Sequence, residues 1–373
     1  MKKWYLIALI IGIFSFGCED YKQQSLPASG GSVDEILVVM NDDQVQTAFS
    51  DTLIYFFMAP YEGISQYEPK FKLRIKKYSQ FEGAGDLLNN YRNIIFCSSF
   101  DHEGSTSTEI KQNLGNQLKK VYSDSTFYFI HKENIYATPQ LVVYLFAPDE
   151  HALINRLTYQ LAPLFKLIKA SENKRLSATI FVTGEQKNLE DSVRALTGIK
   201  LRIPSGYLPI VLSNNASWLR KESTFKDKQD HIQKEIKENI LIRRFDITED
   251  YANQIVFANN DSLNDAIPFA YPIALRDSAA LAMVKGKSEE YSMYTDIIRP
   301  IWQSIDSLYG KQVIVTRGLW RLDNPFMGGP FVNYCYWDDN GQLIMLDGFI
   351  YAAGSEKKKL IREMEVVLSG IHS

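Results

Sequence analysis

Two short apolar runs constrain the fold of the first half of this chain. Ile36–Met40 and Ile94–Cys97 are apolar at every position, and each has about the length of one strand. Successive side chains of a strand point to opposite faces of the sheet, so such a run has to be covered on both faces. This pattern is typical of the central strands of a sheet that carries helices on both sides.

Amphipathic segments alternate with these runs. Apolar periodicity predicts helices over 45–57, 110–121 and 149–170, and further strands over 71–75, 127–130 and 141–146. We expect Pro163 to kink the third helix, because proline has no amide hydrogen to donate to the preceding turn. The alternation predicts an N-terminal α/β-type sandwich over residues 35–184.

The second half has strands that follow one another directly. Asn214-Asn215 separates two strand-like segments, and Asn340-Gly341, the strongest short-range turn signal, separates two more. Pro300 is suited to the first turn of a helix carrying Trp302 and Ile305, and Ser355 to the N-cap of a final helix. We therefore expect an antiparallel sheet with flanking helices over 185–373, which makes the whole chain a two-domain α+β protein.

The N-terminus has the pattern of a bacterial lipoprotein leader. Three residues with two lysines precede the apolar run Trp4–Phe16, whose 13 residues are too few to span a bilayer about 30 Å thick. The junction Gly17-Cys18 resembles a lipobox, although Ser15 stands where an aliphatic residue is usual. The resemblance implies a signal peptide over 1–17 and lipidation of Cys18 with palmitate-type chains. A polar tether over 18–34 would follow.

Charge and cysteine content narrow the function classes. Lys and Arg number 41 against 44 Asp and Glu, so this mildly acidic chain lacks the basic character of a nucleic-acid binder. Three cysteines are too few for a disulfide scaffold. Whether Cys97 and Cys335 pair is left open, because sequence alone does not place their Cα atoms.

Known catalytic and ligand-binding motifs are missing from the sequence. None of the five histidines is spaced from another as in helical zinc sites, and we expect no metal and no cofactor. Ser-x-x-Lys occurs three times in polar stretches, without the companion motifs of a serine–lysine enzyme. We therefore lean away from an enzyme.

The segment 317–331 is the densest in residues suited to binding. It carries two arginines, the large apolar side chains of Trp320, Phe326 and Met327 and the pair Gly328-Gly329, and we first take it as a long loop. The candidate binding surface consists of Arg317, Trp320, Arg321, Asp323, Asn324, Phe326 and Met327. The alternative, which we favour, is a loop that packs its aromatic residues on the sheet and pairs its arginines with acids.

Several segments resemble an uncharacterised family of Bacteroidota lipoproteins, the domain of unknown function DUF4837. They are 35–40, 91–95, 139–143, 147–150, 204–207, 218–221 and, most specifically, 318–331. The resemblance implies a lipid-anchored position in the cell envelope, with the outer membrane as the expected membrane. It implies no catalytic or ligand-binding residue.

Three functions follow as hypotheses. The first is a non-enzymatic envelope module that binds or assembles with another envelope protein. The second is an envelope hydrolase with carboxylates drawn from Asp323, Asp338 or Asp347. The third is a carrier of a small ligand in a cleft between the two domains.

Overall fold

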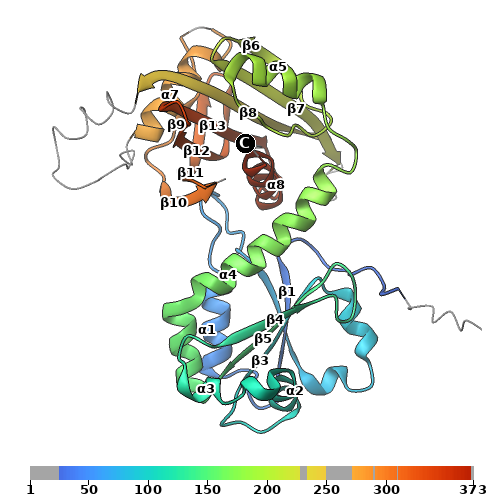
Figure 1. Cartoon of the computed structure of the whole chain (residues 1–373). Coiled ribbons are helices and arrows are strands. Elements are labelled where there is room, and N and C mark those ends of the chain that lie inside the picture. The colour runs from blue at the N-terminus through green and yellow to red at the C-terminus, as the bar shows by residue number, and fades with distance from the viewer. Residues whose placement is uncertain (1–24, 227–232, 249–270, 289, 309, 371–373) are drawn as a thin grey trace, which may run out of the picture.

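A computed structural model describes residues 25–226, 233–248, 271–288, 290–308 and 310–370. Two sheets lie in two separate bodies, with one long helix running between them (Figure 1). The expected α+β class with two sheets is confirmed. Cys18 and the predicted signal peptide lie outside the described residues.

The N-terminal sheet has the strand order β2-β1-β3-β5-β4. Four strands are parallel, and only β4 pairs antiparallel with its neighbour β5. The strands are β1 (Glu35–Met40), β2 (Lys72–Lys77), β3 (Asn93–Ser99), β4 (Phe129–Glu133) and β5 (Leu141–Ala147). Every residue of β3 and β5 is buried, as the continuous apolar runs predict.

Helices cover both faces of this sheet. One face packs against α1 (Ala48–Phe57) and α4 (Glu150–Ile180), and the other against α2 (Ser105–Leu114) and the short α3 (Lys120–Ser123). Three 3-10 turns, Tyr78–Phe81, Gly85–Asn90 and Gly115–Gln117, complete the connections. Residues 28–34, which we expected in the tether, instead pair with the body of the domain, as in the bridge between Ala28 and Thr138.

The helix α4 is longer than the sequence pattern suggests and carries the expected kink. Gln160, three residues before Pro163, has non-helical dihedral angles (φ −130°, ψ 22°). The kink exposes the Gln160 carbonyl, which accepts a hydrogen bond from the Tyr128 hydroxyl. Beyond the kink α4 extends to Ile180 and so reaches the C-terminal domain (Figure 1).

The C-terminal sheet has eight strands in the order β10-β11-β12-β13-β8-β7-β6, with β9 beside β11. All its pairings are antiparallel. The strands are β6 (Leu208–Ser213), β7 (Ala216–Lys226), β8 (Gln233–Thr248), β9 (Tyr294–Thr295), β10 (Trp302–Leu308), β11 (Lys311–Asp323), β12 (Phe326–Trp337) and β13 (Gln342–Ala352). The helices α5 (Lys187–Thr197) and α8 (Lys358–Ser369) pack on one face and α7 (Tyr271–Met283) on the other.

Two local expectations in this domain fare differently. The hairpin at Asn340-Gly341 is confirmed: Gly341 has φ +68°, and the Asp338 carboxylate accepts hydrogen bonds from the turn amides of Asn340 and Gln342. The helix expected after Pro300 is wrong, because residues 302–308 form the edge strand β10, paired along its length with β11. Pairing with a neighbouring strand outweighs the helical spacing of Trp302 and Ile305.

No helix among the described residues is both long and apolar enough to cross a bilayer.

Candidate functional site

The segment 317–331 is a β-hairpin and not a loop. Its residues belong to β11 and β12, which pair from Ile314 with Cys335 to Asp323 with Phe326. Strand alternation sends neighbouring side chains to opposite faces, so the seven candidate residues do not share one surface. Arg317 faces α8, whereas Trp320 belongs to the core on the α7 side.

The expectation that Trp320 is exposed is wrong. Its side chain is 3% exposed, packs edge-on against Phe349 at 5.5 Å and donates a hydrogen bond from Nε1 to the Ile350 carbonyl at 3.1 Å. Gly329 lies against the same carbonyl, and a side chain at that position would collide with it. Trp320 is therefore a core residue, as the packing alternative predicted.

The hairpin tip carries the remaining candidates. Phe326 is 75% exposed, and the Arg321 guanidinium lies 5.5 Å from its ring centre. Arg321 also pairs with Asp296 at 3.8 Å and Asp323 at 3.9 Å, while Met327 is partly buried. Asn324 contributes its backbone carbonyl, which accepts from the amide of Lys287. The tip is thus exposed and ion-paired, and it is separate from Arg317.

Arg317 leads to the junction between the two domains. The connection between α1 and β2 forms an arm, closed by a bridge between Pro60 and Pro69, that reaches across to the C-terminal domain. Tyr61 and Ile64 of this arm belong to the hydrophobic core of that domain. At Gly63 (φ +81°) the arm passes so close to β11 that a Cβ atom would lie 3.1 Å from Arg317 Cβ.

A buried carboxylate, Glu365 of α8, collects charges from both domains. Its oxygens accept hydrogen bonds from Arg317 Nε at 2.8 Å, Arg362 Nη1 at 3.2 Å and the Tyr61 hydroxyl at 2.8 Å. The Lys169 ammonium of α4 lies 3.5 Å away. We call these five residues the Glu365 centre.

The Glu365 centre holds its carboxylate ionised. Burial alone would raise the pKa of Glu365, but the charges of Arg317, Lys169 and Arg362 and the Tyr61 hydrogen bond hold it well below its ordinary value. Glu365 therefore carries a full negative charge at neutral pH, and it partly neutralises the surrounding cations.

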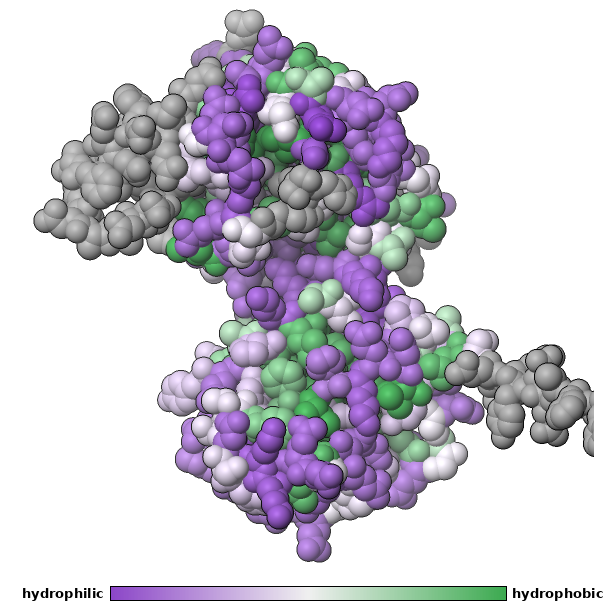
Figure 2. Space-filling model, viewed as in Figure 1, coloured by the Kyte–Doolittle hydropathy of each residue, from purple (hydrophilic) through white to green (hydrophobic). Residues whose placement is uncertain are grey.

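A second carboxylate, Asp34, ties the start of β1 to the same helix. Its Oδ2 lies 3.4 Å from both Lys358 Nζ and Arg362 Nε. Arg362 also donates to Asn173 of α4 at 2.8 Å, so its three nitrogens bond to three different residues. Burial lowers the pKa of Lys358 in spite of Asp34. Hydrophilic residues accordingly cover the waist between the domains (Figure 2).

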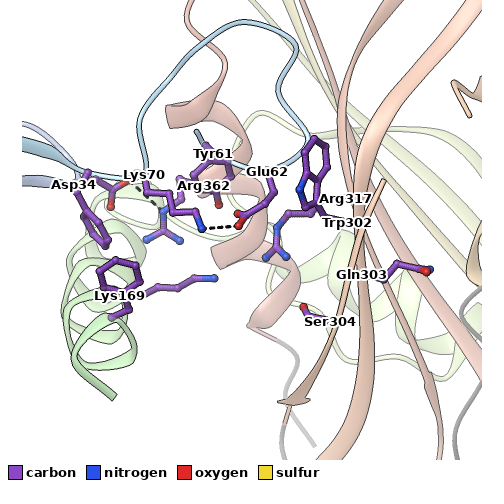
Figure 3. Close-up of a pocket in the computed structure, with 12 residues that line it drawn as sticks. Asp34, Tyr61, Glu62, Lys70, Lys169, Trp302, Gln303, Ser304, Arg317 and Arg362 are labelled. Atoms are coloured by element: carbon purple, nitrogen blue, oxygen red, sulfur yellow. Dashed lines mark hydrogen bonds and ion pairs between the residues drawn. The ribbon is translucent and has the colours of Figure 1, made fainter. Parts of the chain in front are cut away.

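A pocket of about 280 Å³ opens beside these two carboxylates. Aromatic side chains from both domains form part of its walls: Tyr61, Phe71, Phe165 and Trp302. Its charged lining residues are Asp34, Glu62, Lys70, Lys169, Arg317 and Arg362. Figure 3 shows Lys70, Lys169 and Arg317 pointing toward one another across it, with Ser304 at its β10 side. A concave site with apolar walls and a few convergent polar groups is the default place to look for a ligand.

The three carboxylates considered for a hydrolase have separate structural roles. Asp347 is fully buried, where its Oδ1 accepts from Arg276 Nε at 3.0 Å and from Asn333 at 3.1 Å. Asp338 shapes a turn, and Asp323 belongs to the hairpin tip. Each has a structural partner, so the structure does not assemble them into a pair of catalytic carboxylates.

The carboxyl edge of the N-terminal sheet is a second place to look for a ligand. The strand order reverses between β1 and β3, and the crevice at such a switch point is where doubly wound folds bind ligands. Here Asn41 fills it: Oδ1 accepts from the Thr106 amide at 2.9 Å, and Nδ2 donates to Ser98 and Ser107. The chain's own side chains occupy this crevice.

Metal and thiol chemistry have no assembled site in the described part of the chain. There, no three His, Cys, Asp or Glu side chains are grouped so as to hold a metal ion. His102 pairs with Asp43 at 2.8 Å, and this hydrogen bond raises the pKa of His102. Cys97 and Cys335 are both buried and free, since they lie in β3 and β12 of different domains.

Sequence reasoning found one residue of the pocket, Arg317, and missed the others. One signal was available in the last helix, where Lys358, Arg362 and Glu365 are spaced four and three residues apart and so share a helix face. This charged face lies beside the apolar face of the same helix. Charged residues at the border of a buried face indicate a buried ionic contact. Nothing in the sequence pairs this charged face with Tyr61 or Lys169.

Removal of the central negative charge tests the Glu365 centre. We expect Glu365→Gln to lower the free energy of unfolding by about 3–5 kcal/mol, because Arg317 and Arg362 lose their buried counter-charge. The measurement is urea denaturation at pH 7. Glu356→Gln is the control: its carboxylate is 77% exposed and 3.9 Å from Lys72, so we expect a change below about 1 kcal/mol.

The pH dependence of stability in wild type and Glu365→Gln tests whether folding lowers the pKa of Glu365. Since the folded state depresses the pKa of Glu365, its stabilisation is complete above the unfolded value of 4.5 and is lost as the pH falls below it. The difference between wild type and Glu365→Gln should therefore narrow at about pH 3. A variant as stable as wild type at pH 7 would contradict the assignment.

Comparison with known families divides the chain at the same place as the two sheets. Residues 186–370 match the model of a domain of unknown function, DUF4837, and residues 29–181 match that of another, DUF8532. No curated protein matches the sequence.

Among solved structures, one from Bacteroides thetaiotaomicron VPI-5482 at 1.50 Å resolution is 8% identical, with a TM-score of 0.22. The match covers 47% of this chain and 44% of that one, so this chain spans less than half of that protein's length. The resemblance to DUF4837 noted in the sequence is confirmed for the C-terminal domain, whereas its N-terminal segments fall within the second model. The C-terminal domain of the chain, residues 186–370, thus matches the DUF4837 family.

Proposed function

We propose that this protein is a lipid-anchored envelope protein that binds a small molecule in the pocket between its two domains. The observation that carries the proposal is the pocket itself, which has aromatic walls and inward-pointing polar groups from both domains. Of the three hypotheses drawn from the sequence, this supports the carrier with a cleft between its domains.

A binding role fits the chemistry of the pocket better than a catalytic one. Lys70 is paired with Glu62 at 2.6 Å, and the Glu365 centre fixes its carboxylate between cations. A general base needs a pKa near the working pH, whereas Glu365 has its pKa held far below that. The ionic groups of the pocket are therefore suited to hold a ligand in place.

The anchor half of the proposal rests on the leader and on the position of the tether. Residues 28–34 dock on the N-terminal domain, and Asp34 lines the pocket. Ala28 follows Cys18 by ten positions, a reach of at most about 35 Å. An acylated Cys18 would thus hold the pocket near the membrane surface.

Blocking the pocket tests the binding half. Ser304 lies exposed on the edge strand β10 and lines the pocket, so Ser304→Trp should fill it without disturbing a core. We expect native mass spectrometry of wild-type protein from its own membranes to show a bound small molecule that Ser304→Trp lacks. Ser307→Trp, on the same strand outside the pocket, is the matched control. Identical spectra for wild type and Ser304→Trp would contradict the proposed function.

Replacement of Cys18 tests the anchor half. We expect Cys18→Ala to move the protein from the detergent phase to the aqueous phase in detergent partitioning and to abolish incorporation of labelled palmitate, because the only acylated thiol is lost. Cys97→Ala, a change in a buried thiol, should leave partitioning unaltered. Continued palmitate incorporation in Cys18→Ala would refute lipidation at this residue.

A second candidate function, binding of a partner protein, is favoured by the exposed hairpin tip. Phe326, Ile297 and Ile298 are 75%, 73% and 86% exposed, and Arg321 links them by contacting both Phe326 and Asp296. Large apolar side chains beside an arginine are typical of binding hot spots.

Purification from native membranes tests this second candidate. Phe326→Ser combined with Ile298→Ser should lose a stoichiometric protein companion, whereas Tyr55→Ser, equally exposed at 74% on α1, should retain it. Retention of every companion by the double variant would exclude the hairpin tip as the contact.

A further inference from the structure

The charges around the pocket do not balance. Among the described residues, five cationic and three anionic side chains line the pocket or form an ion pair with a side chain that lines it: Lys70, Lys169, Arg317, Lys358 and Arg362 against Asp34, Glu62 and Glu365. The cations therefore share three anions and exceed them by two in a partly desolvated place. Because charges removed from water are normally paired, such an excess indicates that an anion completes the site.

Two of the five cations keep unused hydrogen-bonding capacity. Arg317 donates to Glu365 through Nε only, and within the described chain its Nη1 and Nη2 have no hydrogen-bond partner. Among the residues that the structure describes, Lys169 makes a single ion pair, at 3.5 Å with Glu365, and its side chain is 43% exposed. Both point into the pocket in Figure 3.

The other three cations have partners within the protein. Arg362 uses all its nitrogens, as described above. Lys358 Nζ donates to the carbonyls of Pro69 and Lys70 at 2.8 and 3.0 Å, and Lys70 is paired with Glu62. Arg362 and Lys358 are thus bonded to the protein and Lys70 has Glu62 as its own counter-charge, whereas Lys169 and the outer nitrogens of Arg317 remain for a ligand.

We propose that the pocket binds a small organic anion whose carboxylate or phosphate lies between Lys169 and Arg317. This inference rests on the proposed function above. The Nη1 and Nη2 fork matches the spacing of two oxygens of a carboxylate or phosphate, and Lys169 adds a point charge beside it. The Asp34 carboxylate lies beyond Arg362 from this position, so it does not oppose the anion directly (Figure 3).

The aromatic walls define the rest of the ligand. Phe71 and Phe165 pack together at 5.4 Å, and Trp302, 38% exposed, stands above Arg317 at the rim. These faces suit a flat ring, since aromatic surfaces favour stacked and edge-on contacts. With about 280 Å³ available, the ligand is a compact ring that carries one anionic group.

Isothermal titration calorimetry with three matched probes tests the inference on the full mature chain in detergent. The probes are benzoate, phenyl phosphate and benzamide, which is the neutral isostere of benzoate. We expect each anion to bind at least about tenfold more tightly than benzamide, because a charge-assisted hydrogen bond is worth that factor or more. A higher salt concentration should weaken the binding of both anions and leave the binding of benzamide unaffected.

Lys169→Met removes the cation and keeps most of the apolar stem. We expect this variant to bind the two anions at least about tenfold more weakly and to bind benzamide with unchanged affinity. The control is Lys166→Met, an exposed lysine one turn earlier on the same helix, which should bind all three probes as wild type does. Circular dichroism establishes that both variants are folded.

The outcomes separate this inference from the proposed function. Benzamide binding as tightly as benzoate, or a preference for anions that survives in Lys169→Met, overturns the anion site but leaves a ligand pocket in place. No binding of either anion at about 10 mM also overturns it. The proposed function itself is decided separately, by the small molecule that Ser304→Trp excludes.

Discussion

The buried carboxylate of Glu365 contacts side chains from several segments that meet at the domain junction. Arg317 comes from the sheet, Arg362 from the same helix, Lys169 from α4 and Tyr61 from the arm between α1 and β2. For the buried groups Glu365, Arg317 and Arg362, ionisation is costly alone and acceptable only with their partners. The relative position of the two domains therefore depends on one ionic centre assembled from four segments.

The pocket follows from the same arrangement. The Glu365 centre needs hydrogen-bond donors from several directions. The long side chains that supply them leave part of the space between the two domains unfilled. The aromatic residues of the arm, α4 and β10 close the remaining sides. The arm also makes the junction firm, because Tyr61 and Ile64 lie in the core of the other domain. The site is thus built between parts that are held in place before any ligand arrives.

The sequence predicted the elements better than the site. The runs at β1 and β3, the kink near Pro163 and the turn at Gly341 each depend on neighbours within a few residues, and all are present. The interpretation of 317–331 as a loop is wrong: its glycines favour irregular backbone, but its alternation of large and charged residues also fits a strand. For Trp320 the sequence leaves both a binding surface and packing on the sheet open, because it does not tell which face of a strand is covered.

By itself the sequence determined the α+β class and the local pattern of strands, helices and turns, because these follow from short-range pattern and composition. The leader with its cysteine stays a prediction from the sequence. Only the tertiary structure decided which charges meet. Asp34, Tyr61, Lys169, Arg317 and Glu365 span more than 300 residues of chain, and the contacts that unite them have no period and no motif. Their meeting depends on how two sheets, an arm and two helices pack, and packing is a property of the whole chain.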